Sequence, residues 1–219
     1  MKHTVILSGG LDSTVALEWC LQLHPRNTVR TVTIDYGQRH RDMEIGAARR
    51  VAEHYDVPHD VIDLQPLLAQ STSSLVGTGN GDIPKDQYDE ASMASTVVHG
   101  RNLLFAAAAL THGGPGTLWL GVHGGDHHLY PDCRPEFWHA LTAITEEAYG
   151  VEIMTPFLNY SKAGIVERGQ MFGAPFELTY SCYEGGPTHC GQCGTCTERR
   201  QAFITAGVTD PTEYGRHER

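Results

Sequence analysis

The feature that most constrains the fold is a short apolar run near the N-terminus that ends in two glycines. Residues 3–7 (HTVIL) predict a buried strand, and Ser8-Gly9-Gly10 follows directly. From Leu11 onward, apolar residues recur at helical spacing until His24-Pro25 ends the pattern. A strand that enters a helix through a glycine turn indicates an α/β fold.

The same alternation continues along the chain. Further strands are predicted at 29–35, 59–64 and 117–122, and further helices at 41–55, 101–112, 137–148, 161–172 and 197–206. This order predicts a Rossmann-like parallel sheet with helices on both faces. Ligands of such sheets bind at the carboxyl ends of the strands. Ser8, Asp35 and His123 all fall at or just beyond such ends.

Composition excludes several classes of protein. The formal net charge is −10, which opposes stable binding to nucleic acid, whose affinity is largely electrostatic. No apolar run is long enough to cross a bilayer, and the N-terminus does not resemble a signal peptide. We therefore expect a cytoplasmic protein, in which the six cysteines serve metal binding or catalysis before disulfides.

The segment from Ser8 to Thr14 (SGGLDST) predicts a phosphate-binding turn. Two glycines permit close backbone approach, and the N–H groups at the start of the following helix point toward an anion. The turn has no lysine, so it is not the loop of kinases and GTPases. The alternative is that Asp12 or Ser13 merely caps the helix.

This turn resembles the pyrophosphate-binding loop (PP-loop) of the ATP-pyrophosphatases, which cleave ATP between the α and β phosphates. Three further strings narrow the resemblance: DYGQRH at 35–40, HGRN at 99–102 and YPDCR at 130–134. Together with the C-terminal SCY…HCGQCGTC, they closely resemble the 7-cyano-7-deazaguanine synthase (QueC) family. That resemblance implies an ATP-dependent carbon–nitrogen ligase that converts 7-carboxy-7-deazaguanine and ammonia, through an amide, to a nitrile used in queuosine biosynthesis.

The chain departs from the common family pattern at His99 and at Leu129, both near the expected substrate pocket. Two alternatives therefore stay open. One is a related ligase that passes the activated acid to a protein amine, and the other is a nucleotide-binding protein without catalysis. The sequence also leaves a homodimer open. His123, His127 and His128 are expected to line the pocket or to pack as polar residues rather than to bind a transition metal.

The resemblance and the chemistry of the side chains together predict the site residues. Arg101 offers a two-pronged donor to a carboxylate or phosphate. Catalysis is assigned to Ser8, Asp12, Ser13, Arg101 and Asp132. The predicted ATP site comprises Leu7, Ser8, Gly9, Gly10, Asp12, Ser13, Thr14, Asp35, Tyr36, Arg39, His40 and Lys162, with Mg²⁺ on the phosphates. The predicted substrate site comprises Gln38, Arg101, Asn102, Asp126, Tyr130, Asp132 and Arg134.

Four cysteines in the last forty residues predict a metal site. Cys182, Cys190, Cys193 and Cys196 supply four soft ligands, which suit tetrahedral Zn²⁺. An iron–sulfur cluster or a redox CxxC is the competing interpretation, and the family resemblance favours one structural zinc per chain. We accordingly expect a PP-loop domain over 1–180, with a lid-like insertion at about 65–100, and a zinc-binding segment over 181–219 packed on the same domain.

Overall fold

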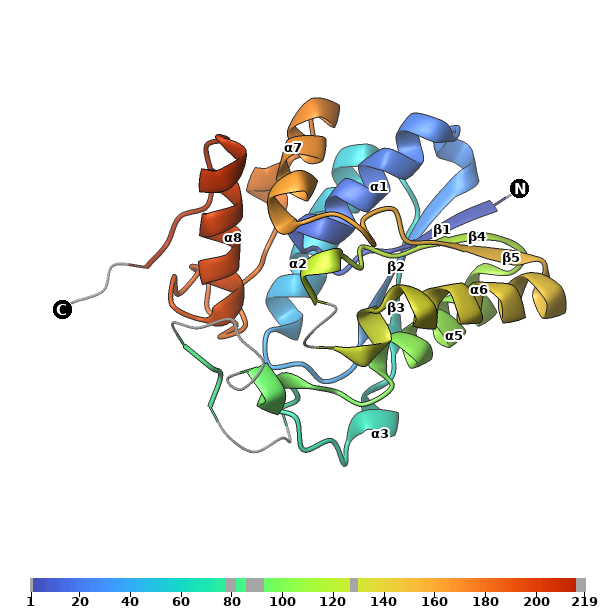
Figure 1. Ribbon diagram of the computed structural model, residues 1–219, viewed down its shortest axis with the longest axis horizontal. Helices are drawn as coiled ribbons and strands as arrows, with labels where there is room; N and C mark the ends of the chain where they lie inside the picture. Colours follow the sequence, from blue (N-terminus) through green and yellow to red (C-terminus); the bar gives the residue numbers. More distant parts are fainter. Residues whose placement is uncertain (1, 78–81, 86–92, 127–129, 216–219) are drawn as a thin grey trace.

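The computed structural model describes residues 2–77, 82–85, 93–126 and 130–215. Its centre is a parallel sheet in the order β3-β2-β1-β4-β5 (Figure 1). The strands are β1 (Lys2–Ile6), β2 (Val29–Asp35), β3 (His59–Asp63), β4 (Gly116–Trp119) and β5 (Val151–Met154). β1 lies in the middle, with Val5 opposite Thr31 of β2 on one side and opposite Trp119 of β4 on the other. The turn after β1 is therefore placed at the centre of the sheet's carboxyl edge.

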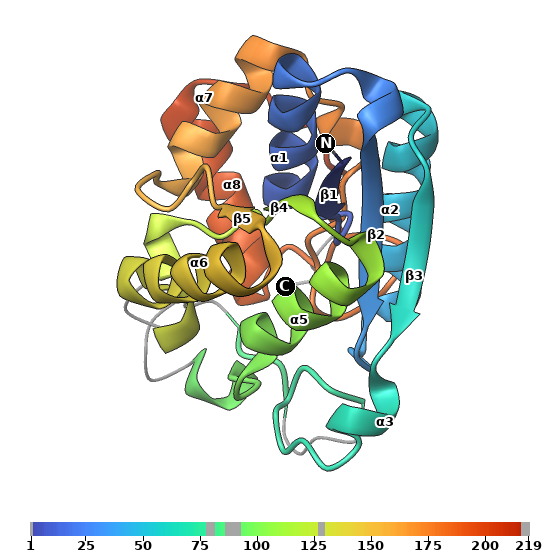
Figure 2. The ribbon, with the colours of Figure 1, turned by 90° about the vertical axis from the view of Figure 1, so that its right-hand side faces the viewer.

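Helices cover both faces of the sheet, as Figure 2 shows. α1 (Leu11–Leu23) and α2 (Arg41–Tyr55) lie on one face, and α5 (Arg101–Gly113) and α6 (Pro135–Tyr149) on the other. The side-chain alternation of β1 explains this arrangement, because Val5 packs toward α1 and α2 while Ile6 packs toward α5 and α6. A central parallel strand is buried on both faces, which is why Val5, Ile6 and Leu7 follow one another without a polar residue and why the polar His3 and Thr4 are themselves buried.

Two further helices stand beside α1 rather than over the sheet. α7 (Lys162–Phe172) and α8 (Gly194–Ala206) pack together, and α7 also packs on α1 (Figure 1). Their shared core contains Val15, Ile165 and Phe203. The remaining short elements are α3 (Gln65–Leu68) and the 3₁₀ turns at Arg26–Thr28, Ala94–Thr96, Gly124–Asp126, Pro131–Cys133 and Phe176–Leu178. No helix among the described residues is long and apolar enough to cross a membrane.

The fold class predicted from sequence is confirmed, and two local differences stand out. β5 was not predicted, because its four residues VEIM are too short to show a period. The strand expected over 117–122 ends at Trp119, since Leu120–Val122 bends into the cavity described below. In the region 65–100, the described parts are α3, one 3₁₀ turn and irregular backbone, and within them Leu75, Val76 and Ile83 are buried. The remainder of the predicted lid lies outside the described residues.

Candidate active site

A cavity of about 240 Å³ opens at the carboxyl edge of the sheet. The glycine turn, the end of β2, the start of α5 and the C-terminal segment all contribute to its walls. It brings together nine of the residues predicted from sequence: Ser8, Gly10, Asp12, Ser13, Tyr36, His40, Arg101, Asn102 and Lys162. The position agrees with the general rule that ligands of open parallel sheets bind beyond the carboxyl ends of the strands.

The glycine turn is held by its own hydroxyl groups. The Ser8 amide donates to Ser13 Oγ at 3.1 Å, and the Gly10 amide contacts Ser8 Oγ at 3.3 Å. No side chain caps α1, so neither Asp12 nor Ser13 plays the simple capping role that the sequence left open. The start of this helix instead faces the cavity, where backbone N–H groups and the helix dipole favour an anion.

Gly9 explains why the turn needs a glycine at this point. Its φ is +80°, a conformation that L side chains rarely adopt. A Cβ atom here would also lie 2.5 Å from the carbonyl oxygen of Glu44 and 2.6 Å from the amide nitrogen of Ala48. The turn therefore lies directly against the backbone of α2, and any side chain at residue 9 would push the two apart.

Lys162 lies between two carboxylates at the mouth of the glycine turn. Its Nζ is 2.7 Å from Asp12 Oδ2 and 3.3 Å from Glu198 Oε2. His123 completes the group, with Nε2 3.8 Å from Asp12 Oδ2 and 3.4 Å from Lys162 Nζ. Ser161 caps α7 by accepting a hydrogen bond from the Gly164 amide, which fixes the helix start that carries Lys162. The ammonium is thereby held beside the turn, where it can meet phosphate oxygens.

Arg101 enters the cavity from the first turn of α5. Its guanidinium carbon lies 5.9 Å from the ring centres of both Tyr36 and Tyr130, within the range of a cation–π contact. Asn102 is held by its neighbours: its side chain donates to the Asp132 carbonyl oxygen at 3.2 Å. Asp132 Oδ2 in turn accepts a hydrogen bond from the backbone N–H of Asn102 at 3.1 Å, so the Asp132 carboxylate binds the first turn of α5.

A third carboxylate, that of Glu44 of α2, also lines the cavity. Its Oε2 accepts a hydrogen bond from Gln38 Nε2 at 2.9 Å, and its Oε1 lies 3.4 Å from His40 Nε2. Burial alone would raise the pKa of Glu44. The His40 ring, the Gln38 hydrogen bond and the charge of Arg101 outweigh burial and lower that pKa, so the carboxylate is ionised at neutral pH.

Several predicted site residues are not among those that line the cavity as described. Leu7 and Thr14 are fully buried, Asp35 accepts from the Gly37 amide and from Gln65, and Gln38 supports Glu44 from behind. Tyr130 is buried and pairs with Thr96 through its hydroxyl at 2.8 Å. The others are Gly9, Arg39, Asp132 and Arg134. Asp126 ends a 3₁₀ turn and its side chain lies outside the described residues, as do His127, His128 and Leu129.

The sequence did not point to the cavity residues that come from α2, from α5 beyond its first turn and from the C-terminal segment. They are Glu44, Phe105, Tyr180, Ser181, Tyr183, Thr195 and Glu198. Glu44 looks like an ordinary acid in the first turn of a helix, where carboxylates are common. Thr195 and Glu198 are three residues apart on α8, a spacing that places both on one helix face. That spacing beside the CxxC motif was the one available signal.

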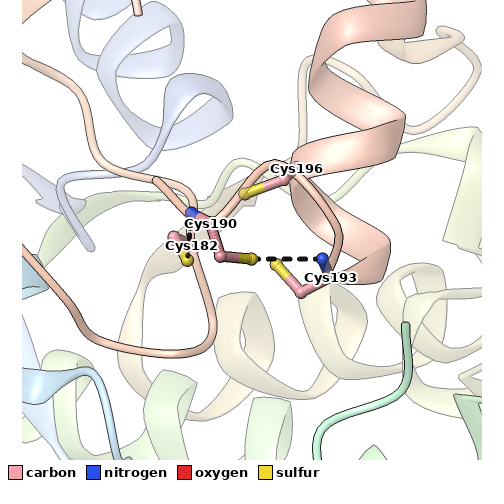
Figure 3. A group of neighbouring side chains, drawn as sticks. All are labelled: Cys182, Cys190, Cys193 and Cys196. Atoms are coloured by element: carbon pink, nitrogen blue, oxygen red, sulfur yellow. Dashed lines mark hydrogen bonds between the residues drawn. The ribbon is translucent and has the colours of Figure 1, made fainter. Parts of the chain in front are cut away.

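The four C-terminal cysteines form a compact group (Figure 3). Their sulfur atoms all lie within 4.8 Å of one another, and three of the four cysteines are buried. Backbone amides point at the sulfurs: Cys190 N lies 3.3 Å from Cys182 Sγ, and Cys193 N lies 3.2 Å from Cys190 Sγ. None of the six cysteines forms a disulfide. Four thiol ligands with amide donors make a group that fits a metal ion.

Comparison with known proteins agrees along nearly the whole chain. Residues 2–207 match the family model described as queuosine biosynthesis protein QueC. The 7-cyano-7-deazaguanine synthase of Allorhizobium ampelinum is 43% identical over 98% of this chain and 92% of that protein. The 7-cyano-7-deazaguanine synthase of Agrobacterium fabrum is 44% identical, with the same coverage.

Among solved structures, the U34-tRNA thiolase NcsA from Methanococcus maripaludis, with its 4Fe–4S cluster, aligns with a TM-score of 0.47 at 14% identity. The alignment covers 94% of this chain and 66% of that chain. A similarity at this level does not bear on the choice of metal or substrate.

Proposed function

Because this chain belongs to the QueC family of queuosine biosynthesis proteins, we propose that it is a 7-cyano-7-deazaguanine synthase. The enzyme activates 7-carboxy-7-deazaguanine with ATP and converts it with ammonia to the nitrile, releasing AMP and pyrophosphate. One observation carries this proposal. The cavity at the sheet edge joins a lysine-free glycine turn to an arginine that has no carboxylate partner among the described residues.

The chemistry runs through two activations of the same carbon. The substrate carboxylate attacks the α-phosphorus of ATP, and pyrophosphate leaves. Ammonia attacks the acyl carbon, AMP leaves with loss of a proton, and an amide results. The amide oxygen attacks the α-phosphorus of a second ATP, and pyrophosphate and one N–H proton leave. Departure of AMP with the remaining N–H proton then gives the nitrile. Such steps depend on positioning and charge neutralisation more than on covalent help from the protein.

The residues of the cavity divide between the two substrates. The amides of the glycine turn and the Lys162 ammonium receive the pyrophosphate, while Ser8, Asp12 and Ser13 shape that end of the cavity. Arg101 receives the carboxylate through two parallel N–H groups. Mg²⁺, when bound, neutralises the phosphate charge, and Asp12 is the acid best placed to meet it, since its buried Oδ1 has no hydrogen-bond partner.

We also propose that the four cysteines bind one structural Zn²⁺ and that the chain divides into a PP-loop domain and a zinc-binding segment. Zinc–sulfur bonds of about 2.3 Å separate the thiolates of a tetrahedral site by about 3.8 Å, so the cysteine group closes on one Zn²⁺ with small side-chain movements. The metal is structural: it fixes the segment that carries Thr195 and Glu198. The PP-loop domain spans 1–180 with a lid at about 65–100, and the zinc-binding segment spans 181–219.

Mass spectrometry of the reaction tests the function directly. The enzyme is incubated with ATP, Mg²⁺, 7-carboxy-7-deazaguanine and ammonium, with and without candidate acceptor proteins. We expect AMP, pyrophosphate and an ammonium-dependent nitrile, with the amide as an intermediate, and Arg101→Ala should abolish the product. Formation of ADP would overturn the assignment to ATP-pyrophosphatases. Consumption of the acid only when a protein gains its mass would replace the synthase by a conjugating ligase.

A further inference from the structure

Glu44 is a cavity carboxylate to which the chemistry described so far gives no role. Three carboxylates line the described cavity, and two of them, Asp12 and Glu198, are paired with Lys162. Glu44 has no lysine or arginine partner among the described residues, although 17% of its side chain is accessible. Its close basic neighbour is the His40 ring, with Nε2 3.4 Å from Oε1, so the carboxylate keeps acceptor positions that face the cavity and can meet donors of the ligand.

The surroundings of Glu44 hold its carboxylate in place and leave it free to accept more hydrogen bonds. Gln38 occupies one lone pair on Oε2, and Gln38 is itself fixed because its Oε1 accepts from the Tyr36 amide at 3.0 Å. His40 is only 2% exposed, and neither of its ring nitrogens has a hydrogen-bond partner. A carboxylate offers about four acceptor positions, so several remain open toward the cavity.

Arg101 and Glu44 both line the cavity, as does Tyr36. The guanidinium carbon of Arg101 lies 5.9 Å from the centre of the Tyr36 ring, and the charge of Arg101 is one of the influences that lower the pKa of Glu44. The cavity therefore presents a two-pronged donor beside a two-pronged acceptor. Phe105 and Tyr36 add aromatic surface next to them, with ring centres 5.3 Å apart. This is the arrangement that a flat, polar-edged heterocycle requires.

The acid substrate has the complementary order of groups along one edge. Its carboxylate stands beside the ring carbonyl, and both accept hydrogen bonds. The ring N–H and the exocyclic amino group come next along the same edge, and both donate. Read from one end, the edge is acceptor, acceptor, donor, donor. Arg101 matches the first pair and Glu44 matches the second, since both side chains line the same cavity.

We propose that Glu44 is the specificity-determining residue that accepts hydrogen bonds from the ring N–H and the amino group of the deazaguanine acid, beside Arg101 on the carboxylate and carbonyl. This inference rests on the proposed function. It assigns base recognition to α2, whereas two of the residues predicted from sequence for the substrate site, Asn102 and Asp132, are hydrogen-bonded to each other at the start of α5. Gln38 then acts as a positioning residue behind Glu44.

The first arm of the test uses the wild-type enzyme and two acids. One is 7-carboxy-7-deazaguanine, and the other is the same acid without the exocyclic amino group. A lost bidentate contact costs about 1–3 kcal/mol in recognition of a base, so kcat/KM should favour the amino-bearing acid by about tenfold to a hundredfold. Equal kcat/KM values would overturn the inference. If neither acid yields AMP, the proposed function fails instead.

The second arm compares Glu44→Gln with Glu198→Gln. These make the same change at opposite ends of one cavity, and zinc content and thermal unfolding confirm that each variant is folded. Glu44→Gln should reduce the preference between the two acids to about threefold or less, because an amide cannot accept from both donors at once. Glu198→Gln should lower turnover of both acids by the same factor and leave the preference unchanged. A Glu44→Gln variant that keeps the wild-type preference would show that Glu44 only supports the wall, and so would one that lowers turnover of both acids by one common factor.

Discussion

The two ends of the active-site cavity are built in different ways. The glycine turn follows the central strand of the sheet and is held by hydrogen bonds between residues at most five positions apart. The segment that carries the four cysteines, from Tyr180 to Gly215 and called the cysteine segment below, contributes no strand to the sheet among these residues. It makes only isolated β-bridges, such as that between His189 and Tyr214. Contacts between residues close in sequence thus hold the glycine turn, whereas the cysteine segment depends on contacts with residues farther away along the chain.

A buried ion pair and the cysteine group supply that long-range support. Arg199 of α8 is 1% exposed, and its Nε lies 3.2 Å from Asp210 Oδ1. The same guanidinium donates to Thr179 Oγ1 at 2.7 Å and to the Phe176 carbonyl oxygen at 3.3 Å. One side chain therefore joins α8 to the segment before it and to the chain after it.

The two regions meet at two points. The Tyr180 amide donates to the Gly9 carbonyl oxygen at 2.8 Å, and Glu198 lies 3.3 Å from the same lysine that pairs with Asp12. The comparison shows that a locally determined phosphate turn still depends on a segment that is far away in sequence. Changes in the cysteine segment should therefore reach the ATP site, while changes in the turn should leave the cysteine segment intact.

The largest effect is expected from removing the metal. Structural zinc contributes roughly 10–16 kcal/mol to the folding of small zinc peptides, so chelation or Cys193→Ser should unfold the cysteine segment and abolish turnover. The parallel sheet should persist, because Tyr183 is the one residue of this segment that packs against its two core clusters as described. Hydrogen exchange followed by mass spectrometry would locate the loss of protection, which we expect from about residue 181 onward. As a control, turnover and protection should return when Zn²⁺ is added back and should not return with Fe²⁺. Recovery with Fe²⁺ alone would identify an iron site.

Removing the buried guanidinium should be the next most damaging change. Arg199→Met removes the buried guanidinium and leaves Asp210, whose side chain is 13% exposed, without its ionic partner; breaking a buried pair costs about 3–5 kcal/mol. Arg200→Met is the matched control, since the neighbouring Arg200 is exposed and contacts the Tyr214 ring at 5.6 Å, a contact worth about 1 kcal/mol or less. Chemical denaturation measures the free energy of unfolding of both variants. Equal losses for the two variants would mean that burial of Arg199 does not hold the segment.

Substitutions of Lys162 and Glu198, where the two regions meet, should lower turnover more than they lower stability. Lys162→Met removes the ammonium that we propose to contact the phosphates, and loss of one such group lowers the rate by about a hundredfold to a thousandfold. Glu198→Gln keeps the side-chain shape and leaves Asp12 to hold Lys162 at 2.7 Å, so we expect a decrease of about tenfold, in the range of one partly screened charge contact. Steady-state kinetics with the acid and ATP would rank them. If Glu198→Gln were the more severe change, Glu198 would have a role of its own on the phosphates.

Sequence patterns predicted the sheet and the glycine turn because both follow from short-range periodicity. The run HTVIL and the turn SGGLDST lie within fourteen residues. The patterns missed polar cavity residues outside the motifs, such as Glu44, Thr195 and Glu198, because their position depends on packing between distant elements. Asp132 illustrates the limit: it lies in a motif typical of the family, yet its carboxylate serves the Asn102 amide. Glu44 illustrates the converse, since only the fold brings α2 beside Arg101.

The smallest and most specific effect concerns thiol reactivity in the two regions. Burial raises the pKa of Cys20, in α1 beside the sheet, to about 12. At pH 8 its thiolate fraction is therefore about one in ten thousand, and the thiolate is the reactive form. In zinc-depleted protein, iodoacetamide should modify Cys182, Cys190, Cys193 and Cys196 while Cys20 stays unmodified, as peptide mass spectrometry would show. Protein unfolded in guanidinium is the control and should label at all six cysteines. Labelling of Cys20 at the rate of the C-terminal cysteines would mean that losing the metal opens the sheet as well, and the two regions would then unfold as one unit.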